Sequence, residues 1–218
     1  MRAVIAGGHG KIALALERLL AERGDEVVGL IRNPDHADEL EKLGAEPAIF
    51  DLENDTAEEL AKILDGADAV VFAAGAGPGS GIARKRTVDY GGAVLLADAA
   101  ERAGVRRYVM VSAIGVDRGS EHIEDETFAA YVDAKREADA DVMSRDLDWT
   151  ILRPGGLTDD PGTGLVTMGD DVGMGQVPRE DVAAVIAAVL DEPESAGVVA
   201  ELISGDTAIV DAVEGLWA

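Results

Sequence analysis

Short apolar runs rich in Val, Ile and Ala alternate along this chain with longer stretches in which apolar residues recur at helical spacing. Such runs are typical of strands covered on both faces, and the longer stretches are typical of the helices that cover them. The pattern predicts strands at residues 2–6, 26–31, 46–50, 68–74, 106–112, 149–153 and 197–203. It predicts helices at residues 10–23, 34–43, 56–65, 87–103, 127–145 and 179–191. Strands that alternate with helices in this way indicate repeated βαβ units.

The chain is expected to form one domain over residues 1–218, because no repeat, low-complexity tract or Pro/Gly-rich linker divides it. Several predicted helices are followed by a glycine, which suits the left-handed residue at a helix end: Gly24, Gly44, Gly66 and Gly104. The prediction is an α/β, Rossmann-type, doubly wound domain with a mostly parallel sheet of about seven strands and a small C-terminal substrate-side region. Residues 155–178 are the least regular stretch, and we interpret them as a substrate-side loop or, alternatively, as a surface loop without a role.

Composition narrows the range of partners. The chain has 19 Lys and Arg against 43 Asp and Glu, a formal net charge of −24 that repels nucleic acids and anionic lipid. It has no cysteine, which excludes disulfides and thiolate metal sites, and its three histidines show no metal-ligand spacing. No signal peptide or membrane-spanning stretch is seen. We expect a cytoplasmic protein, a monomer or small homo-oligomer, that acts on a small molecule and binds neither metal, nucleic acid nor membrane.

A glycine-rich turn follows the first predicted strand and opens the first helix. Gly7, Gly10 and Ala13 form G-x-x-G-x-x-A in "AGGHGKIA". Gly7 permits a sharp turn and Gly10 permits close backbone approach, so the N–H groups of the helix can face a pyrophosphate. A nucleotide triphosphate P-loop is excluded, because Ile12 follows Lys11 where Ser or Thr would bind magnesium.

Further residues at strand ends extend this prediction to a dinucleotide. Arg32 and Asn33 follow the second strand, where an arginine suits a 2′-phosphate and therefore NADP(H) in preference to NAD(H). Asp51 and Leu52 follow the third strand, within reach of an adenine edge, and the small residues of "FAAGAG" follow the fourth, where a ribose can lie against the backbone. Arg32 could instead be a solvated surface residue, and Asp51 could be a turn or helix-cap residue.

Acid–base chemistry is indicated by Tyr131 and Lys135, whose spacing places both side chains on one face of a helix. A tyrosine titrates near 10 in general, which is too high for acid–base catalysis at neutral pH, and a neighbouring lysine ammonium and an oxidised nicotinamide would both favour its phenolate. A basic cluster at Arg84 to Arg86 could meet an anionic substrate or the cofactor phosphates, or it could be an ordinary surface cluster.

The motifs together resemble the short-chain dehydrogenase/reductase superfamily, in particular its atypical NAD(P)H-binding group with the NmrA-like and biliverdin-reductase-B-like proteins. The resemblance rests on "GGHGKIA", "IRNP", "DLEND", "FAAGAG", "VMVSAIG", "YVDAKREAD", "WTILRPGG" and "VPREDVAAVI", which cover nearly the whole chain in the family order. The turn departs from the family pattern at Gly8, His9 and Ala13.

The resemblance implies roles for individual residues. Tyr131, Lys135 and Ser112 would be catalytic, with Ser112 orienting the substrate carbonyl and Lys135 also binding the nicotinamide ribose. The cofactor would be contacted by Gly7, His9, Gly10, Lys11, Ile12, Arg32, Asn33, Asp51, Leu52, Ala73, Ala74, Gly75, Lys135 and Pro154. Each of three residues has an alternative role. His9 could equally lie at the surface, Ser112 could form an ordinary hydrogen bond at the end of a strand, and Pro154 could serve simply to terminate a strand.

The expected function is an NADP(H)-dependent oxidoreductase acting on a carbonyl or alcohol. The alternatives are a redox-sensing regulator without turnover and an isomerase or oxygenase-like enzyme. The substrate pocket would be lined by residues 76–86, 113–128 and 155–178. These stretches contain no recognition motif that identifies the substrate.

Overall fold

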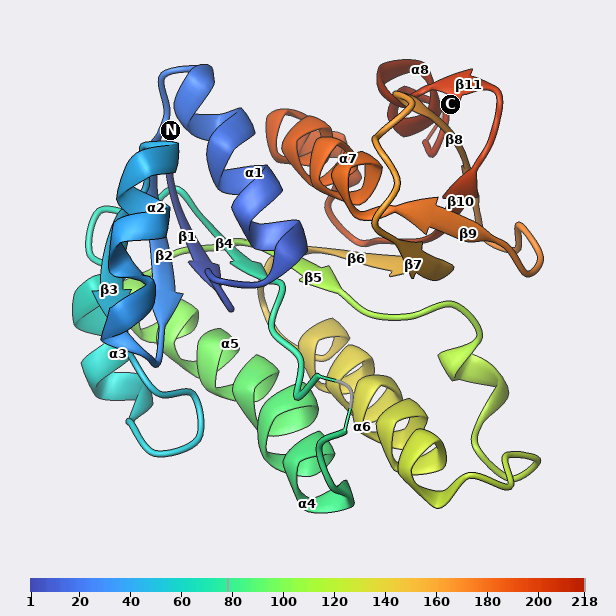
Figure 1. Ribbon diagram of the computed structural model, residues 1–218, viewed down its shortest axis with the longest axis horizontal. Coiled ribbons are helices and arrows are strands. Elements are labelled where there is room, and N and C mark those ends of the chain that lie inside the picture. The colour runs from blue at the N-terminus through green and yellow to red at the C-terminus, as the bar shows by residue number, and fades with distance from the viewer. Residues whose placement is uncertain (78, 218) are drawn as a thin grey trace.

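A nine-stranded sheet runs through the protein in the order β11-β8-β10-β6-β5-β4-β1-β2-β3 (Figure 1). The computed structural model describes residues 1–77 and 79–217. Position 78, in the stretch 76–86 expected beside the substrate, lies outside the described residues, as does position 218. The strands of the large sheet are β1 (Arg2–Ala6), β2 (Glu26–Ile31), β3 (Glu46–Ile49), β4 (Ala69–Phe72), β5 (Arg107–Val111), β6 (Asp148–Pro154), β8 (Leu165–Gly169), β10 (Val198–Ser204) and β11 (Thr207–Ala208).

Helices cover both faces of this sheet (Figure 1). They are α1 (Lys11–Glu22), α2 (Ala37–Leu43), α3 (Ala57–Ile63), α4 (Ile82–Arg84), the π-helix η2 (Lys85–Tyr90), α5 (Gly91–Ala103), α6 (Glu126–Met143), α7 (Arg179–Asp191) and α8 (Ile209–Glu214). Helices α1 and α7 lie on one face, and α3, α5 and α6 lie on the other. This arrangement confirms the predicted doubly wound α/β fold.

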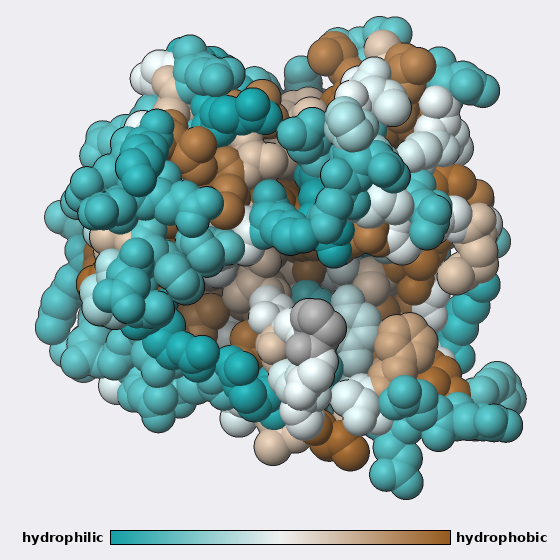
Figure 2. All heavy atoms as spheres, viewed as in Figure 1, coloured by the Kyte–Doolittle hydropathy of each residue, from teal (hydrophilic) through white to brown (hydrophobic). Residues whose placement is uncertain are grey.

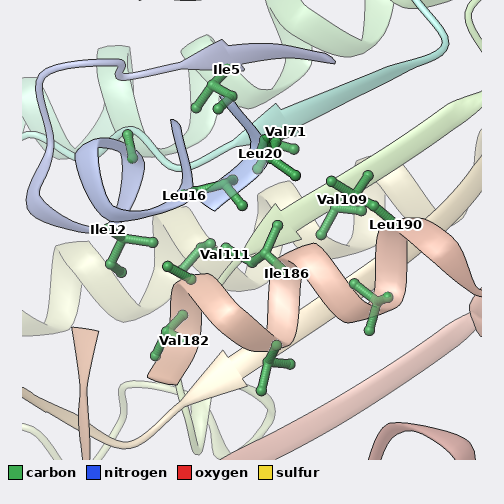
Figure 3. Packing of buried hydrophobic residues seen from close by; sticks show 14 of the residues in the cluster. Ile5, Ile12, Leu16, Leu20, Val71, Val109, Val111, Val182, Ile186 and Leu190 are labelled. Atoms are coloured by element: carbon green, nitrogen blue, oxygen red, sulfur yellow. The ribbon is translucent and has the colours of Figure 1, made fainter. Parts of the chain in front are cut away.

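The apolar periodicity of the helices has its counterpart in the core. Leu16 and Leu20 of α1 and Ile186 of α7 are fully buried against Val71 and Val109 of the sheet (Figure 3). A second buried cluster lies on the opposite face, between the sheet and α3, α5 and α6. The central strands are thus buried on both sides, which explains their unbroken apolar runs.

The seven predicted strands are all present, and the sheet contains two further strands that the sequence did not predict. β8 pairs antiparallel with β10, and β11 pairs antiparallel with β8. β11 has only two residues and forms the edge of the sheet, and β8 is antiparallel to both of its neighbours, so neither carries the pattern of a buried parallel strand.

Residues 155–178 are more regular than the irregular loop we expected. They contain β7 (Gly156–Thr158), β8 and β9 (Gln176–Pro178), and β7 and β9 form a separate two-stranded parallel sheet. A strand of only a few residues carries too little alternation for its periodicity to be recognised in the sequence.

The predicted helix at 87–103 also differs from the structure, because α4, η2 and α5 follow one another over residues 82–103. A π-helix is uncommon and is found preferentially at functional sites. No helix in residues 1–77 and 79–217 is long and apolar enough to cross a membrane.

Candidate functional site

The glycine turn between β1 and α1 lies against the carboxyl end of β4. Gly7 has φ +87°, and a Cβ on it would lie 2.6 Å from the Cα of Ala74. Gly10 precedes α1 and offers no side chain to cap the helix, so the first backbone N–H groups of α1 are open to a ligand. The turn therefore requires glycine for both conformation and space.

A cavity of about 350 Å³, here called the turn cavity, opens beside the glycine turn. Most of the residues that the sequence assigned to the cofactor line it: Gly7, His9, Gly10, Arg32, Asn33, Asp51, Leu52, Ala73, Ala74 and Gly75. They come from the ends of four neighbouring parallel strands, β1, β2, β3 and β4, whose carboxyl ends meet at the same edge of the sheet.

Glu53 brings a carboxylate into the turn cavity that the sequence reasoning did not single out. It accepts hydrogen bonds from Arg32 at 3.1 Å, from Arg84 at 2.8 Å and from the hydroxyl of Thr87 at 2.6 Å. The hydrogen bonds from Arg84 and Thr87 hold the pKa of Glu53 below its usual value. Arg32 lines the turn cavity and forms an ion pair there with Glu53.

The carboxylate of Asp51 is engaged in its own turn. Its oxygens accept hydrogen bonds from the backbone N–H of Glu53 at 2.9 Å and the side-chain amide of Asn54 at 2.8 Å. Burial acts to raise the pKa of Asp51, but these hydrogen bonds and the charges of Arg32 and Arg84 outweigh it and hold the pKa below its usual value. Asp51 thus lines the cavity and also acts as a turn residue.

His9 lies at the rim of the turn cavity and pairs with residues of the next βα unit. Its Nε2 lies 2.7 Å from Oε2 of Glu39, and its ring stacks on that of His36 with centroids 3.5 Å apart. Both rings line the cavity. His9 is therefore held in place near the turn by α2 and the segment before it.

A second cavity of about 430 Å³, here called the tyrosine cavity, contains the predicted chemistry-bearing residues. Ser112, Tyr131 and Lys135 line it together with Ile12 and Leu157. Ala73, Ala74 and Gly75 line both cavities, so the two are neighbours across the end of β4. Figure 2 shows the corresponding face of the protein, which is largely hydrophilic and hollowed near its centre.

Lys135 is almost completely buried on α6 and points toward the end of β5. Its Nζ donates a hydrogen bond to the carbonyl of Val111 at 2.8 Å and lies 5.3 Å from the centroid of the Phe72 ring. Burial lowers its pKa, while the nearby carboxylates of Asp89 and Asp139 act in the opposite direction.

Tyr131 differs electrostatically from the sequence-based expectation. Burial raises its pKa above the ordinary value, and the carboxylates of Asp89 and Asp139 raise it further. The expected lowering by Lys135 is not found, because the ammonium is directed at the carbonyl of Val111 and two negative charges lie near the phenol. The protein's own groups therefore favour the neutral phenol, the form that can donate a proton.

Asp139 lies one helical turn beyond Lys135 and was not identified from the sequence. It is 1% exposed and accepts a hydrogen bond from Nε of Arg153 at 3.0 Å. Burial raises its pKa, while the Ser112 hydroxyl and Arg153 act to lower it. Ser112 Oγ is buried close enough to Asp139 to affect its pKa, although no hydrogen bond of ordinary geometry joins it to the described residues.

Two predicted cofactor residues lie outside both cavities. Lys11 is ion-paired with Asp159, which also accepts a hydrogen bond from Arg179 at 2.6 Å, and these residues line a separate groove between α1 and the segment after β7. Pro154 is buried at the end of β6, where its carbonyl accepts a hydrogen bond from the N–H of Ile114 at 3.0 Å. Of residues 155–178, Leu157 reaches the tyrosine cavity.

Some of the missed residues left a signal in the sequence. Lys135 and Asp139 share one helical face, and so do Lys85 and Asp89, because each pair is separated by four positions. Glu17 occupies a position on the apolar face of the first helix between Leu16 and Leu20. Glu53 gave no comparable signal, since its role depends on Arg32 and Arg84 meeting it in space.

Comparisons with known proteins agree with this geometry. The profile of the NAD(P)H-binding family matches residues 7–193. A Bacillus subtilis protein named as the uncharacterized sugar epimerase YhfK is 35% identical over 217 residues, which cover 99% of this chain and 100% of the relative. The oxidoreductase ylbE from Lactococcus lactis superimposes with a TM-score of 0.88 at 31% identity, covering 99% of this chain and 96% of the other.

A third comparison links the chain to a reductase. ChuY, an anaerobillin reductase from Escherichia coli O157:H7, superimposes with a TM-score of 0.79 at 27% identity, covering 94% of this chain and 98% of the other. The similarity to these relatives therefore extends over the whole domain. The chain belongs to the NAD(P)H-binding family of Rossmann-fold proteins, which is consistent with the resemblance to the atypical short-chain dehydrogenase/reductase group seen in the sequence.

Proposed function

We propose that this protein is an NADP(H)-dependent oxidoreductase that transfers hydride between the nicotinamide and a carbonyl or alcohol carbon of a small organic substrate. The observation that carries the proposal is the sharing of Ala73, Ala74 and Gly75 by the two cavities. A dinucleotide laid across these small residues would be held by the glycine turn at its phosphates and would reach Tyr131 with its nicotinamide.

The residues present fit such a cofactor. The close contact of Gly7 with the backbone of Ala74 keeps the turn tight, and the open N–H groups at the start of α1 suit the pyrophosphate. Arg32 would bind the 2′-phosphate, and Asp51 and Leu52 would lie by the adenine. Lys135 would hold the nicotinamide ribose.

The chemistry divides between the cofactor and the protein. When bound, the cofactor supplies or accepts the hydride. Tyr131 donates a proton to the substrate oxygen during reduction, which suits the neutral phenol that its surroundings favour. The hydroxyl of Ser112 orients the same oxygen, and Lys135 positions the ribose near Tyr131.

A turnover assay tests this proposal. Purified protein is titrated with NADPH by fluorescence and then followed at the nicotinamide absorbance band over a panel of small aldehydes, ketones and quinones. Tyr131→Phe is expected to lower kcat about 100-fold and to leave the Kd for NADPH unchanged. Tyr90→Phe is the matched control and should keep full activity, because Tyr90 lies outside both cavities.

Other outcomes distinguish the remaining functions. Tight NADPH binding without oxidation of NADPH by any compound of the panel would support a redox-sensing regulator. The name of the Bacillus subtilis relative makes epimerisation the second candidate. An epimerase would return the hydride to the substrate, so a changed stereocentre without net NADPH consumption would support that function.

A further inference from the structure

Lys85 is a buried cation of the tyrosine cavity with no part in the chemistry proposed above. Lys85 is 9% exposed and lines the cavity from the π-helix η2. Its Nζ donates a hydrogen bond to the carbonyl of Gly77 at 3.0 Å and lies 5.4 Å from the centroid of the Tyr131 ring. An ammonium group has further donors than this bond uses.

The three residues of the basic cluster, Arg84, Lys85 and Arg86, differ in their charge partners. Arg84 pairs with Glu53 in the turn cavity, and Arg86 pairs with Glu137 at the surface. Within residues 1–77 and 79–217, no carboxylate lies within 4.0 Å of Nζ of Lys85. This is unexpected in a chain with 43 acidic against 19 basic residues.

Neither of the two carboxylates that line the cavity in the described part of the chain is bonded to Lys85. Asp89 lies four residues beyond Lys85 on η2 and interacts electrostatically with Lys135 and Lys85, but it is bonded to neither and accepts a hydrogen bond from the N–H of Ala76 at 3.3 Å. Asp125 caps α6 by accepting hydrogen bonds from the backbone N–H groups of residues 127 and 128. A buried, incompletely paired ammonium is costly, so its retention favours an anionic ligand.

The apolar side chains that line the tyrosine cavity indicate what the rest of the ligand is like. Ile12, Phe128 and Leu157 line the same cavity as Lys85, and the ring of Phe128 stacks on Tyr131 with centroids 5.9 Å apart and an interplanar angle of 23°. Phe128 is 53% exposed, so its ring offers a free apolar surface at the mouth. A flat apolar body fits the surface that Ile12, Phe128 and Leu157 offer.

We propose that Lys85 binds a carboxylate of the substrate, and that the substrate is a planar, apolar oxo acid whose carbonyl lies at Tyr131. A carboxylate is favoured over a phosphate, because Lys85 offers one ammonium while Lys135 is directed at the carbonyl of Val111, and no arginine lines the tyrosine cavity among the described residues. The placement of the substrate carbonyl at Tyr131 rests on the proposed function, whereas the binding of a carboxylate by Lys85 does not.

A binding experiment without turnover tests the role of Lys85. The protein saturated with NADP⁺ is titrated calorimetrically with 2-naphthoate and with 2-naphthamide, which differ in charge and hardly in shape. Naphthoate is expected to bind about tenfold more tightly. Lys85→Gln should remove this preference by weakening naphthoate and leaving naphthamide unchanged, and Lys85→Arg should restore part of it.

The controls separate recognition from folding. Lys62→Gln removes one exposed positive charge on α3 and should leave the preference intact. Lys85→Gln retains a donor for the carbonyl of Gly77, and its thermal unfolding is compared with that of the unmodified protein. An unchanged preference in Lys85→Gln, equal binding of the two probes, or no binding of naphthoate up to about 10 mM would each overturn the proposal.

A turnover arm distinguishes this proposal from the proposed function. 4-Carboxybenzaldehyde and 4-formylbenzamide are offered with NADPH, and the acid is expected to have the higher kcat/KM through a lower KM. Failure to reduce either compound, with the naphthoate preference intact, would contradict the oxidoreductase and support Lys85. Reduction of both with equal kcat/KM, unaltered in Lys85→Gln, would support the oxidoreductase and overturn Lys85.

Discussion

The carboxyl group of Glu17 occupies the space that a side chain on Gly29 would need. A Cβ on Gly29 would lie 2.5 Å from Oε1 of Glu17, and one on Gly8 of the glycine turn would lie 3.0 Å from the same atom. Glu17 is 0% exposed, and both of its carboxyl oxygens lack a hydrogen-bond partner among the described residues. Burial raises its pKa to about 8. The neutral acid is therefore packed directly beneath the turn.

This burial predicts that stability falls as pH rises toward 8. The unfolded chain loses the Glu17 proton near pH 4.5, whereas the folded protein keeps it until about pH 8. Between these values the folded state binds the additional proton, so each unit of pH costs about 1.4 kcal/mol, and the loss levels off above pH 8. Glu17→Gln removes this titration, and its stability relative to the unmodified protein should rise by about 3 kcal/mol between pH 5.5 and pH 8.5.

Urea unfolding at the two pH values measures the difference. Glu22→Gln, an exposed position on the same helix, is the matched control and should follow the unmodified protein. A constant stability difference between Glu17→Gln and the unmodified protein across this range would show that Glu17 is ionised in the folded state.

The fold was predictable because its central strands are continuous apolar runs and its helices have regular amphipathic spacing. The same regularity located Gly7, Tyr131 and Lys135 at strand ends and on a helix face, and the structure places Gly7 in the turn cavity and Tyr131 and Lys135 in the tyrosine cavity. The strands within residues 155–178 were missed because their pairing depends on β10 and on each other rather than on local pattern.

The electrostatics of the site could not be predicted in the same way. The pKa of Tyr131 depends on Asp89, which is contributed by η2, and on Asp139, which lies farther along α6 than the recognised motif. The ion pair of Arg32 depends on Glu53, from the next βα connection. These interactions depend on how the fold brings the side chains together in space, and no local spacing in the sequence encodes them.

Replacing Gly7 tests how much of the turn depends on close contact. Gly7→Ala places a methyl group against the backbone of Ala74 at a φ of +87°, and it should lower the free energy of unfolding by about 2–4 kcal/mol and weaken NADPH binding. Gly66→Ala is the matched control, because Gly66 also has a positive φ of +72° but a methyl group there would have nothing within 4 Å of it. That variant should lose about 1 kcal/mol.

Chemical denaturation and NADPH titration of both variants separate strain from contact. If Gly7→Ala and Gly66→Ala lose the same stability and bind NADPH equally well, the contact with Ala74 does not shape the turn.

Removing the Arg32 side chain tests the assignment of the 2′-phosphate. Arg32→Ala is expected to weaken NADPH binding about tenfold or more and to change NADH binding much less, because only NADPH carries the phosphate. Fluorescence titration with both cofactors gives the ratio of Kd values. Arg86→Ala, which removes a surface arginine paired with Glu137, should leave the ratio unchanged. Equal losses for the two cofactors in Arg32→Ala would contradict the assignment.

Glu53 should oppose the effect of Arg32, because the carboxylate and a 2′-phosphate would compete for the same guanidinium groups. Glu53 accepts hydrogen bonds from Arg32 and Arg84, and its lowered pKa keeps it charged at neutral pH. Glu53→Gln leaves both arginines available, so the Kd for NADPH should fall about threefold to tenfold while that for NADH changes little.

The same titrations decide between the two nicotinamide cofactors at this position. Glu58→Gln, exposed on α3, removes one negative charge elsewhere and serves as the control for the general field of the protein. A carboxylate can also accept a hydrogen bond from the free 2′-hydroxyl of NADH. If Glu53→Gln instead weakens NADH and leaves NADPH unchanged, Glu53 binds that hydroxyl, and the preference for NADP(H) proposed from Arg32 is reversed.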